Sequence, residues 1–142
     1  GGDKRCEANA LWQLGRVDLA QGAYASARTR LEQALLAFHG AEMWKELLGC
    51  LEDFAGLAEQ IGMPDAAVRI SAVATLGRQR LGLIRRPAAE SRGQARLEAM
   101  KHPMGDERFV AAWNEAWDQW ETEDAIRCAR SLPMTSEQVL LH

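Results

Sequence analysis

Apolar residues recur along most of the chain at the spacing of one helix face, and no stretch alternates in the way that a strand would. The pattern predicts an all-α fold of about seven helices, with breaks at glycine and proline. Residues 1–132 are expected to form one helical repeat domain, and residues 133–142 a tail or a short extra helix. The expected helices cover residues 4–21, 24–38, 42–61, 64–80, 88–101, 106–120 and 123–130.

The helical pattern repeats with a period of forty residues, so that Gly22 aligns with Gly62. Each of these glycines can adopt the left-handed conformation that ends a helix, and Pro64 suits the first turn of the next one. Alanines in the same register let paired helices approach closely. The repeat therefore predicts antiparallel helical hairpins stacked side by side. The aligned alanines are Ala27 with Ala67 and Ala34 with Ala74.

The first repeat resembles the tetratricopeptide pattern. Leu14-Gly15 stands at its Leu-Gly pair, Ala27 and Ala34 at its two alanines, and Leu31 at its Phe. The resemblance implies a right-handed superhelix of helix hairpins. The sequence departs from the pattern at a few positions: Leu11 replaces Trp, Asp18 replaces the first Tyr, and Phe54-Ala55 replaces Leu-Gly in the second copy.

Residues 10 to 130 also resemble the C-terminal repeat region of large bacterial ATP-binding transcriptional regulators of the LuxR type. The similarity is carried by Leu76-Gly77-Arg78, by the segment from Met104 to Trp113 and by the segment from Glu123 to Ile126. In that family such a region acts as a sensor or lid. The resemblance implies a regulatory role.

Three of the five tryptophans fall in one helical stripe that begins at Phe109. Phe109 and Trp113 match a packing motif of the resembled family and are expected in the core, as aromatic residues at helical spacing usually are. Trp117 and Trp120 depart from that motif. Trp117 is expected to close the C-terminal end of the repeats, and Trp120 to lie partly exposed before Thr122, the predicted N-cap of the last helix.

Composition narrows the function. The net charge is -3, which together with the absence of a helix-turn-helix pattern argues against direct nucleic-acid contact. No apolar run is long enough to span a membrane. The basic segment 78–101 and the acidic segment 106–124 are expected to lie against each other. The chain starts at Gly1-Gly2 without methionine, as expected of a piece of a longer polypeptide.

The residues offer no catalytic, cofactor or metal motif. There is no phosphate-binding glycine loop, no HExxH and no nucleophile elbow. The cysteines lack zinc or redox spacing, so Cys50 and Cys128 are interpreted as small core residues in a reducing cytoplasm. We expect a chain that is not an enzyme and holds no cofactor.

The tetratricopeptide resemblance implies a concave groove lined by the first helix of each hairpin. A tryptophan beside an arginine, opposite two carboxylates, could hold a peptide or another domain. Trp12 could equally pack against a neighbouring repeat. The groove residues carried over from the family are Asn9, Trp12, Arg16, Leu19, Gly49, Glu52, Gly56 and Glu59.

The sequence thus predicts a non-catalytic protein-interaction or sensor module of a larger bacterial transcriptional regulator. Its partners would be a protein or peptide, including other domains of the parent protein. One alternative is a structural module that tethers domains or forms a homodimer through exposed apolar residues such as Leu11, Trp12 or Trp44. A second alternative is a small-molecule-sensing helical domain, which would need a closed apolar pocket.

Overall fold

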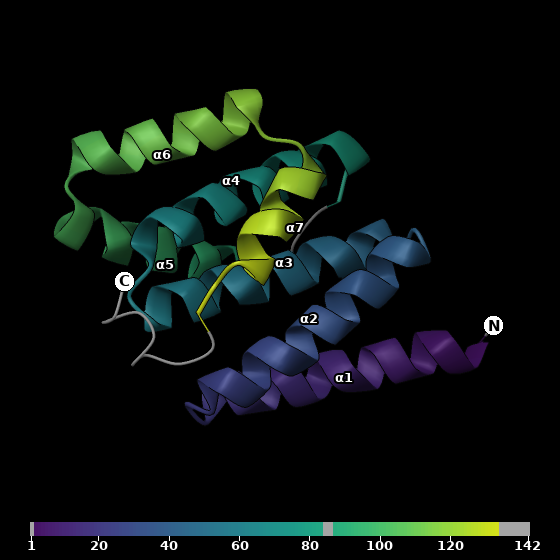
Figure 1. Cartoon of the computed structure of the whole chain (residues 1–142). Helices are drawn as coiled ribbons and strands as arrows, with labels where there is room; N and C mark the ends of the chain where they lie inside the picture. The colour runs from purple at the N-terminus through teal and green to yellow at the C-terminus, as the bar shows by residue number, and fades with distance from the viewer. Residues whose placement is uncertain (1, 84–86, 134–142) are drawn as a thin grey trace.

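In a computed structural model, residues 2–83 and 87–133 are described, and all their regular structure is helical (Figure 1). The expected all-α repeat fold is confirmed, with bounds within a few residues of those predicted. In this part of the chain the helices are α1 (Gly2–Ala20), α2 (Tyr24–Gly40), α3 (Trp44–Gln60), α4 (Pro64–Leu81), α5 (Pro87–Met104), α6 (Asp106–Gln119) and α7 (Thr122–Arg130). The expected tail, 133–142, lies almost wholly outside the described residues.

The first four helices form two antiparallel hairpins, α1 with α2 and α3 with α4, stacked so that α2 packs against α3. Small residues allow the close approach that the sequence predicted. A Cβ at Gly15 would lie 2.9 Å from the Leu31 side chain, and one at Gly77 would lie 2.8 Å from Leu48. The core is centred on these hairpins, where Phe38, Phe54 and their neighbours are fully buried.

The ends of α1 to α4 share one turn geometry. After each helix a residue with positive φ is followed by one whose N–H donates to the carbonyl five residues earlier, with N···O distances of 2.8 to 2.9 Å. This is the Schellman motif, which satisfies carbonyls left open at a helix end. Glycine supplies the positive φ in three of the turns, but Glu42 supplies it in the fourth, with φ 56°. The positive-φ residues are Gly22, Glu42, Gly62 and Gly82.

Asp18, a departure from the tetratricopeptide pattern, is a buried polar residue that joins α1 to α2. Ser26 Oγ donates to Asp18 Oδ2 at 2.8 Å, and Arg30 Nη1 does so at 3.0 Å. A carboxylate that leaves water needs such partners. At this position the contact between α1 and α2 is therefore polar.

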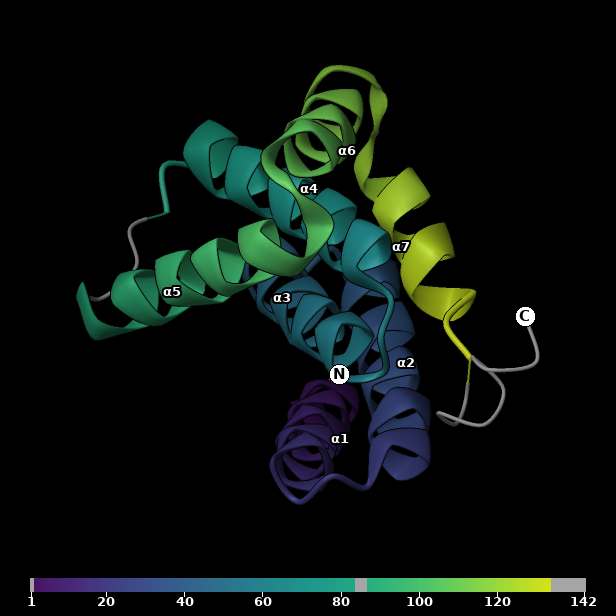
Figure 2. The same ribbon diagram turned by 90° about the vertical axis from the view of Figure 1, so that its left-hand side faces the viewer.

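The third hairpin is less regular than the first two. Helix α6 packs along α4, whereas α5 meets the body mainly near its C-terminal end, and its N-terminal end stands away from α3 (Figure 2). The predicted break at 102–105 begins later than expected, because α5 continues through Pro103, which near a helix end costs only one backbone hydrogen bond. Gly105, with φ 84°, then ends the helix.

Helix α7 does not extend the stack but lies across α4, α3 and α2 (Figure 1). Its N-cap is Glu121 and not the predicted Thr122. The Glu121 side chain accepts the Asp124 N–H, and Asp124 Oδ2 accepts the Glu121 N–H at 2.8 Å, which forms a capping box. At the other end of α7, Arg28 of α2 donates to the carbonyl oxygens of Arg130 and Leu132. No helix of the described residues is long and apolar enough to cross a lipid bilayer.

Candidate functional site

Trp12 lies between the two regular hairpins. Its ring meets Phe38 edge to face at 5.6 Å between centroids and covers Gly49, where a Cβ would come within 2.8 Å of the indole. Its Nε1 donates to Asp53 Oδ2 at 2.6 Å. Trp12 is therefore a packing residue whose polar edge and remaining exposed surface face the groove.

Asp53 of α3 is the carboxylate that both Trp12 and Arg16 of α1 contact. Arg16 Nε lies 3.6 Å from Asp53 Oδ2, and the Arg16 guanidinium lies 5.7 Å from the Trp12 ring centroid, in cation–π range. Burial raises the pKa of Asp53, while the Trp12 hydrogen bond and the Arg16 charge oppose that rise. The carboxylate therefore holds its proton more tightly than an exposed aspartate does.

A second set of contacts ties α4 and α5 to α3. Arg78 donates to Glu52 Oε1 through both Nε, at 3.0 Å, and Nη2. Arg96 of α5 donates to the Glu52 carbonyl oxygen at 3.2 Å, and its Nε lies 3.9 Å from Glu59 Oε2. Burial raises the pKa of Glu59, although the charge of Arg96 opposes this. The arginines of α4 and α5 therefore hold these helices to the carboxylates of α3.

A cleft of about 300 Å³ lies among α1, α3, α4 and α5 and is lined by most of these residues. Four arginines and only two carboxylates line it, so its charge is net positive. Within the described part of the chain, Arg92 contacts no carboxylate at ion-pair distance. The lining residues are Trp12, Arg16, Gly49, Glu52, Asp53, Arg78, Arg92, Gly93 and Arg96.

The structure brings together part of the predicted groove. Trp12, Arg16 and Glu52, with Gly49, line the cleft. Leu19, Gly56 and Glu59 lie beside it: a Cβ at Gly56 would be 3.7 Å from Arg96 Cζ and 3.8 Å from Leu19 Cδ2. Asn9 does not line the cleft, and its Nδ2 donates to the Arg5 carbonyl of its own helix at 3.0 Å.

Sequence reasoning missed Asp53 and the arginines that α4 and α5 bring to the cleft, Arg78, Arg92 and Arg96. Of the two carboxylates that it placed opposite Trp12 and Arg16, Glu52 pairs with Arg78 and Glu59 with Arg96, and the partner of Trp12 is Asp53. The spacing of Arg92 and Arg96, one helical turn apart in a basic segment, was the available signal.

The basic and acidic segments lie against each other as expected, since α5 contacts α6, but several ion pairs of their charged residues are made with other helices. Arg78 and Arg96 pair with α3, while Glu115 of the acidic segment accepts from Arg69 of α4 at 3.0 Å. Lys101 Nζ does lie 5.1 Å from the Phe109 ring centroid, so the segments touch there through a cation–π contact. Among the described basic residues of this segment, Arg78, Arg92 and Arg96 line the cleft.

The aromatic stripe of α6 is a stack. Phe109 and Trp113 are nearly parallel at 6.2 Å, and Trp113 and Trp117 lie at 5.8 Å. Phe109 is buried as expected, whereas Trp113 and Trp117 are partly buried against the core. Trp120 is partly exposed before α7, as predicted. Trp117 and Trp120, the two that depart from the family's motif, therefore pack against the core and do not form an exposed pair.

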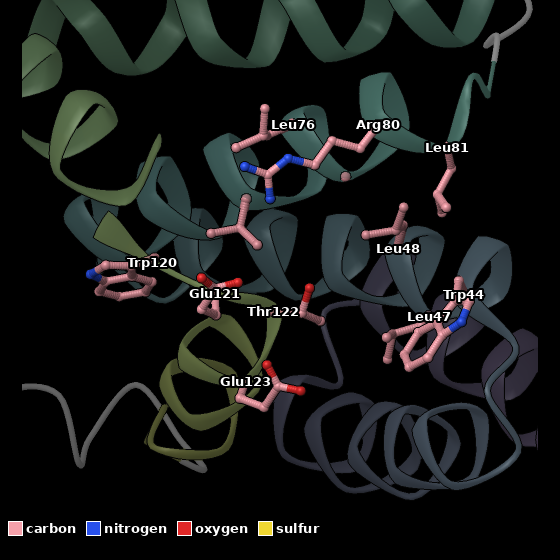
Figure 3. Close-up of a pocket in the computed structure, with 12 residues that line it drawn as sticks. Trp44, Leu47, Leu48, Leu76, Arg80, Leu81, Trp120, Glu121, Thr122 and Glu123 are labelled. Atoms are coloured by element: carbon pink, nitrogen blue, oxygen red, sulfur yellow. The ribbon is translucent and has the colours of Figure 1, made fainter. Parts of the chain in front are cut away.

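A second pocket, of about 260 Å³, shares no lining residue with the cleft (Figure 3). Its floor includes the buried Leu47, Leu48 and Val73. Trp44 and Trp120 stand at its two ends, and Arg80 and Thr122 reach it from α4 and α7. The pocket is apolar, as the small-molecule alternative required, but it is open to solvent and not closed, since Trp44 and Leu81 at its rim are exposed.

Neither of the two cysteines that were interpreted as core residues has the surroundings of a nucleophile. Cys50 is fully buried, its Sγ donates to the Leu31 carbonyl at 3.4 Å, and burial raises the pKa of the thiol well above its usual range. Burial also raises the pKa of Cys128, which is partly buried. A thiol that stays protonated is a poor nucleophile.

The chain is similar to proteins of Mycobacterium bovis and of two strains of Mycobacterium tuberculosis, each named "Putative HTH-type transcriptional regulator". The identity to each is 31% over 121 residues, which cover 85% of this chain and 14% of the relative. The chain thus spans about one seventh of the length of these curated relatives. No protein-family model matches the chain, and no solved structure matches it significantly.

Proposed function

We propose that this chain is a non-catalytic interaction module of a larger bacterial, cytoplasmic transcriptional regulator, and that its cleft binds an acidic segment of a partner protein or of a neighbouring domain. The similarity to the mycobacterial regulators supports the regulatory setting. The observation that carries the binding role is the excess of arginine in the cleft. Arg92 is unpaired among the described residues and lines the same cleft as the partly exposed Trp12.

Binding there would act on the position of α5. Arg96 links α5 to α3 through one hydrogen bond and one long ion pair, while the N-terminal end of α5 stands free of α3 (Figure 2). A carboxylate that enters the cleft competes for Arg96 and attracts Arg92. A partner that prefers one placement of α5 would therefore bias whatever domain responds to it.

The experiment compares a glutamate-rich dodecapeptide with a lysine-rich one in titration calorimetry against the 142-residue chain. We expect binding of the acidic peptide only, weakened by salt and by Arg92→Glu, and unchanged in the matched control Arg5→Glu on the exposed side of α1. Trp12→Ala is unsuitable because the ring packs on Phe38 and Gly49. Equal affinity of Arg92→Glu and the unmodified chain would contradict the proposal.

The same pair of variants tests the regulatory role in the full-length regulator. We expect Arg92→Glu to change the transcriptional response of a reporter, while Arg5→Glu leaves it intact. A normal response from a stably folded Arg92→Glu protein would remove the cleft from the regulatory mechanism.

A further inference from the structure

The second pocket leaves large apolar side chains in contact with water. Trp44 is 41% exposed and Leu81 49% exposed at its rim, above a floor of buried leucines. Three segments distant in sequence build it: the start of α3, the end of α4 and the connection from α6 to α7 (Figure 3). A concave apolar site with a few polar groups is the usual form of a small-molecule site.

The charged groups of this pocket are not equally engaged. Glu121 already accepts a backbone N–H in the capping box, and Glu123 Oε1 lies 3.7 Å from His39 Nε2. Arg80 makes no ion pair or hydrogen bond with another described residue, and it is exposed. Of the charged groups that line this pocket, Arg80 on α4 is therefore the one without a counter-ion among the described residues.

We propose that the pocket binds a small molecule with a flat apolar body and one carboxylate. The body lies between Trp44 and Trp120, and the carboxylate meets the Arg80 guanidinium, whose planar donors suit it. The volume, about 260 Å³, lies just below the range of about 300–1,000 Å³ that is usual for ligand sites, so a molecule of one or two rings fits better than a nucleotide.

A ligand in this position would join α4 to the connection between α6 and α7. Trp120 comes from that connection and Arg80 from the last turn of α4, so one bound molecule contacts both. This site is independent of the proposed cleft, because no residue lines both. Variants of one site can therefore be tested with the other intact.

The experiment measures the binding of 2-naphthoate and of its neutral analogue 2-naphthamide to the 142-residue chain by ligand-observed NMR and calorimetry. We expect 2-naphthoate to bind more tightly than the amide. Arg80→Gln should weaken 2-naphthoate about tenfold, the value of one charge-assisted hydrogen bond, and leave the amide unchanged. Trp44→Ala, at an exposed position, should weaken both compounds, whereas Arg5→Gln should weaken neither.

Three results would overturn the proposal. One is the absence of binding by 2-naphthoate up to its solubility limit, and another is equal binding of the acid and the amide, which would leave Arg80 as a cation that only complements the end of α4. The third is a concentration-dependent dimer in sedimentation that Trp44→Ala dissociates and 2-naphthoate does not, which would make a second copy of the chain the occupant.

Discussion

The indole Nε1 of Trp12 donates a 2.6 Å hydrogen bond to Asp53 Oδ2 and thereby joins the first hairpin to the second. The two residues are 41 positions apart. The bond places a polar contact at the edge of an apolar interface, where the ring of Trp12 also meets Phe38. Several expected outcomes depend on this arrangement and on the turns that set the helices in register.

The stability of the folded chain should depend on the protonation of Asp53. Its pKa is raised by burial in the folded chain and is about 3.9 when unfolded. The folded state therefore binds the proton more tightly, and this contribution to stability is lost as pH rises from about 4 through the folded pKa. In urea unfolding, the free energy of unfolding of the unmodified chain should fall relative to that of Asp53→Asn as pH rises through this range. The pKa of Glu59 is raised in the same direction, but its contribution cancels in this comparison because both proteins retain Glu59. A pH-independent difference would contradict this prediction.

Gly49→Ala should destabilise the contact between α1 and α3. The added Cβ would lie 2.8 Å from the Trp12 ring, so the indole must shift away from Asp53. We expect a loss of about 1–3 kcal/mol in the free energy of unfolding, together with a change in tryptophan fluorescence. The control is Gly40→Ala, where a Cβ meets nothing within 4 Å and helix propensity favours alanine by at most about 1 kcal/mol. Equal effects of the two variants would show that close packing at Gly49 is unimportant.

Glu42→Gly should stabilise the chain. Glu42 holds φ 56° in a turn whose equivalents are glycines, and a side chain in that region costs about 1 kcal/mol or more. Part of the gain is offset by the greater freedom of glycine when unfolded, so we expect a net increase of about 0.5–1 kcal/mol in chemical denaturation. The mirror variant Gly62→Glu, in open space at φ 82°, should lose about 1 kcal/mol. Destabilisation by Glu42→Gly would mean that its side chain has a role of its own.

Arg28→Met should loosen α7. The Arg28 side chain is 13% exposed and donates to the carbonyl oxygens of Leu132 and Arg130, which the end of α7 leaves without helical partners. We expect a loss of about 1.5–3 kcal/mol and faster amide hydrogen exchange in α7 than in α3. Arg127→Met on α7 itself, where the side chain is 77% exposed, should change stability by less than about 0.5 kcal/mol. Unchanged exchange in α7 of Arg28→Met would refute this role.

The helices and their order could be predicted from the sequence because apolar periodicity and glycine are local signals. The turn at Glu42 shows the limit. Nothing in its residue type indicates a positive φ, and only its place midway between Gly22 and Gly62 does. The path of α7 was also not predictable, since its return to α2 depends on Arg28, more than one hundred positions away from Arg130.

The central residues of the candidate cleft were predicted from the sequence, but the charged residues that pair with them were not. Trp12 and Arg16 were found because they occupy groove positions of the first helix of a hairpin. Whether Glu52 or Asp53 meets Trp12 depends on the rotation of α3 against α1, and consecutive residues differ by about 100° in direction. That rotation is set by the packing of the Trp12 ring on Gly49, and this contact cannot be predicted from the periodicity of the sequence.

The positive-φ residues at 22, 42, 62 and 82 divide the first four helices into segments of equal length. Consecutive segments run in opposite directions, so the smallest exchangeable cassette is forty residues and not twenty. Duplicating 23–62 would lengthen the stack by one hairpin and return every later helix to its original direction. Duplicating 43–62 alone would reverse every later helix, and α4, α6 and α7 would then meet the wrong ends of their neighbours.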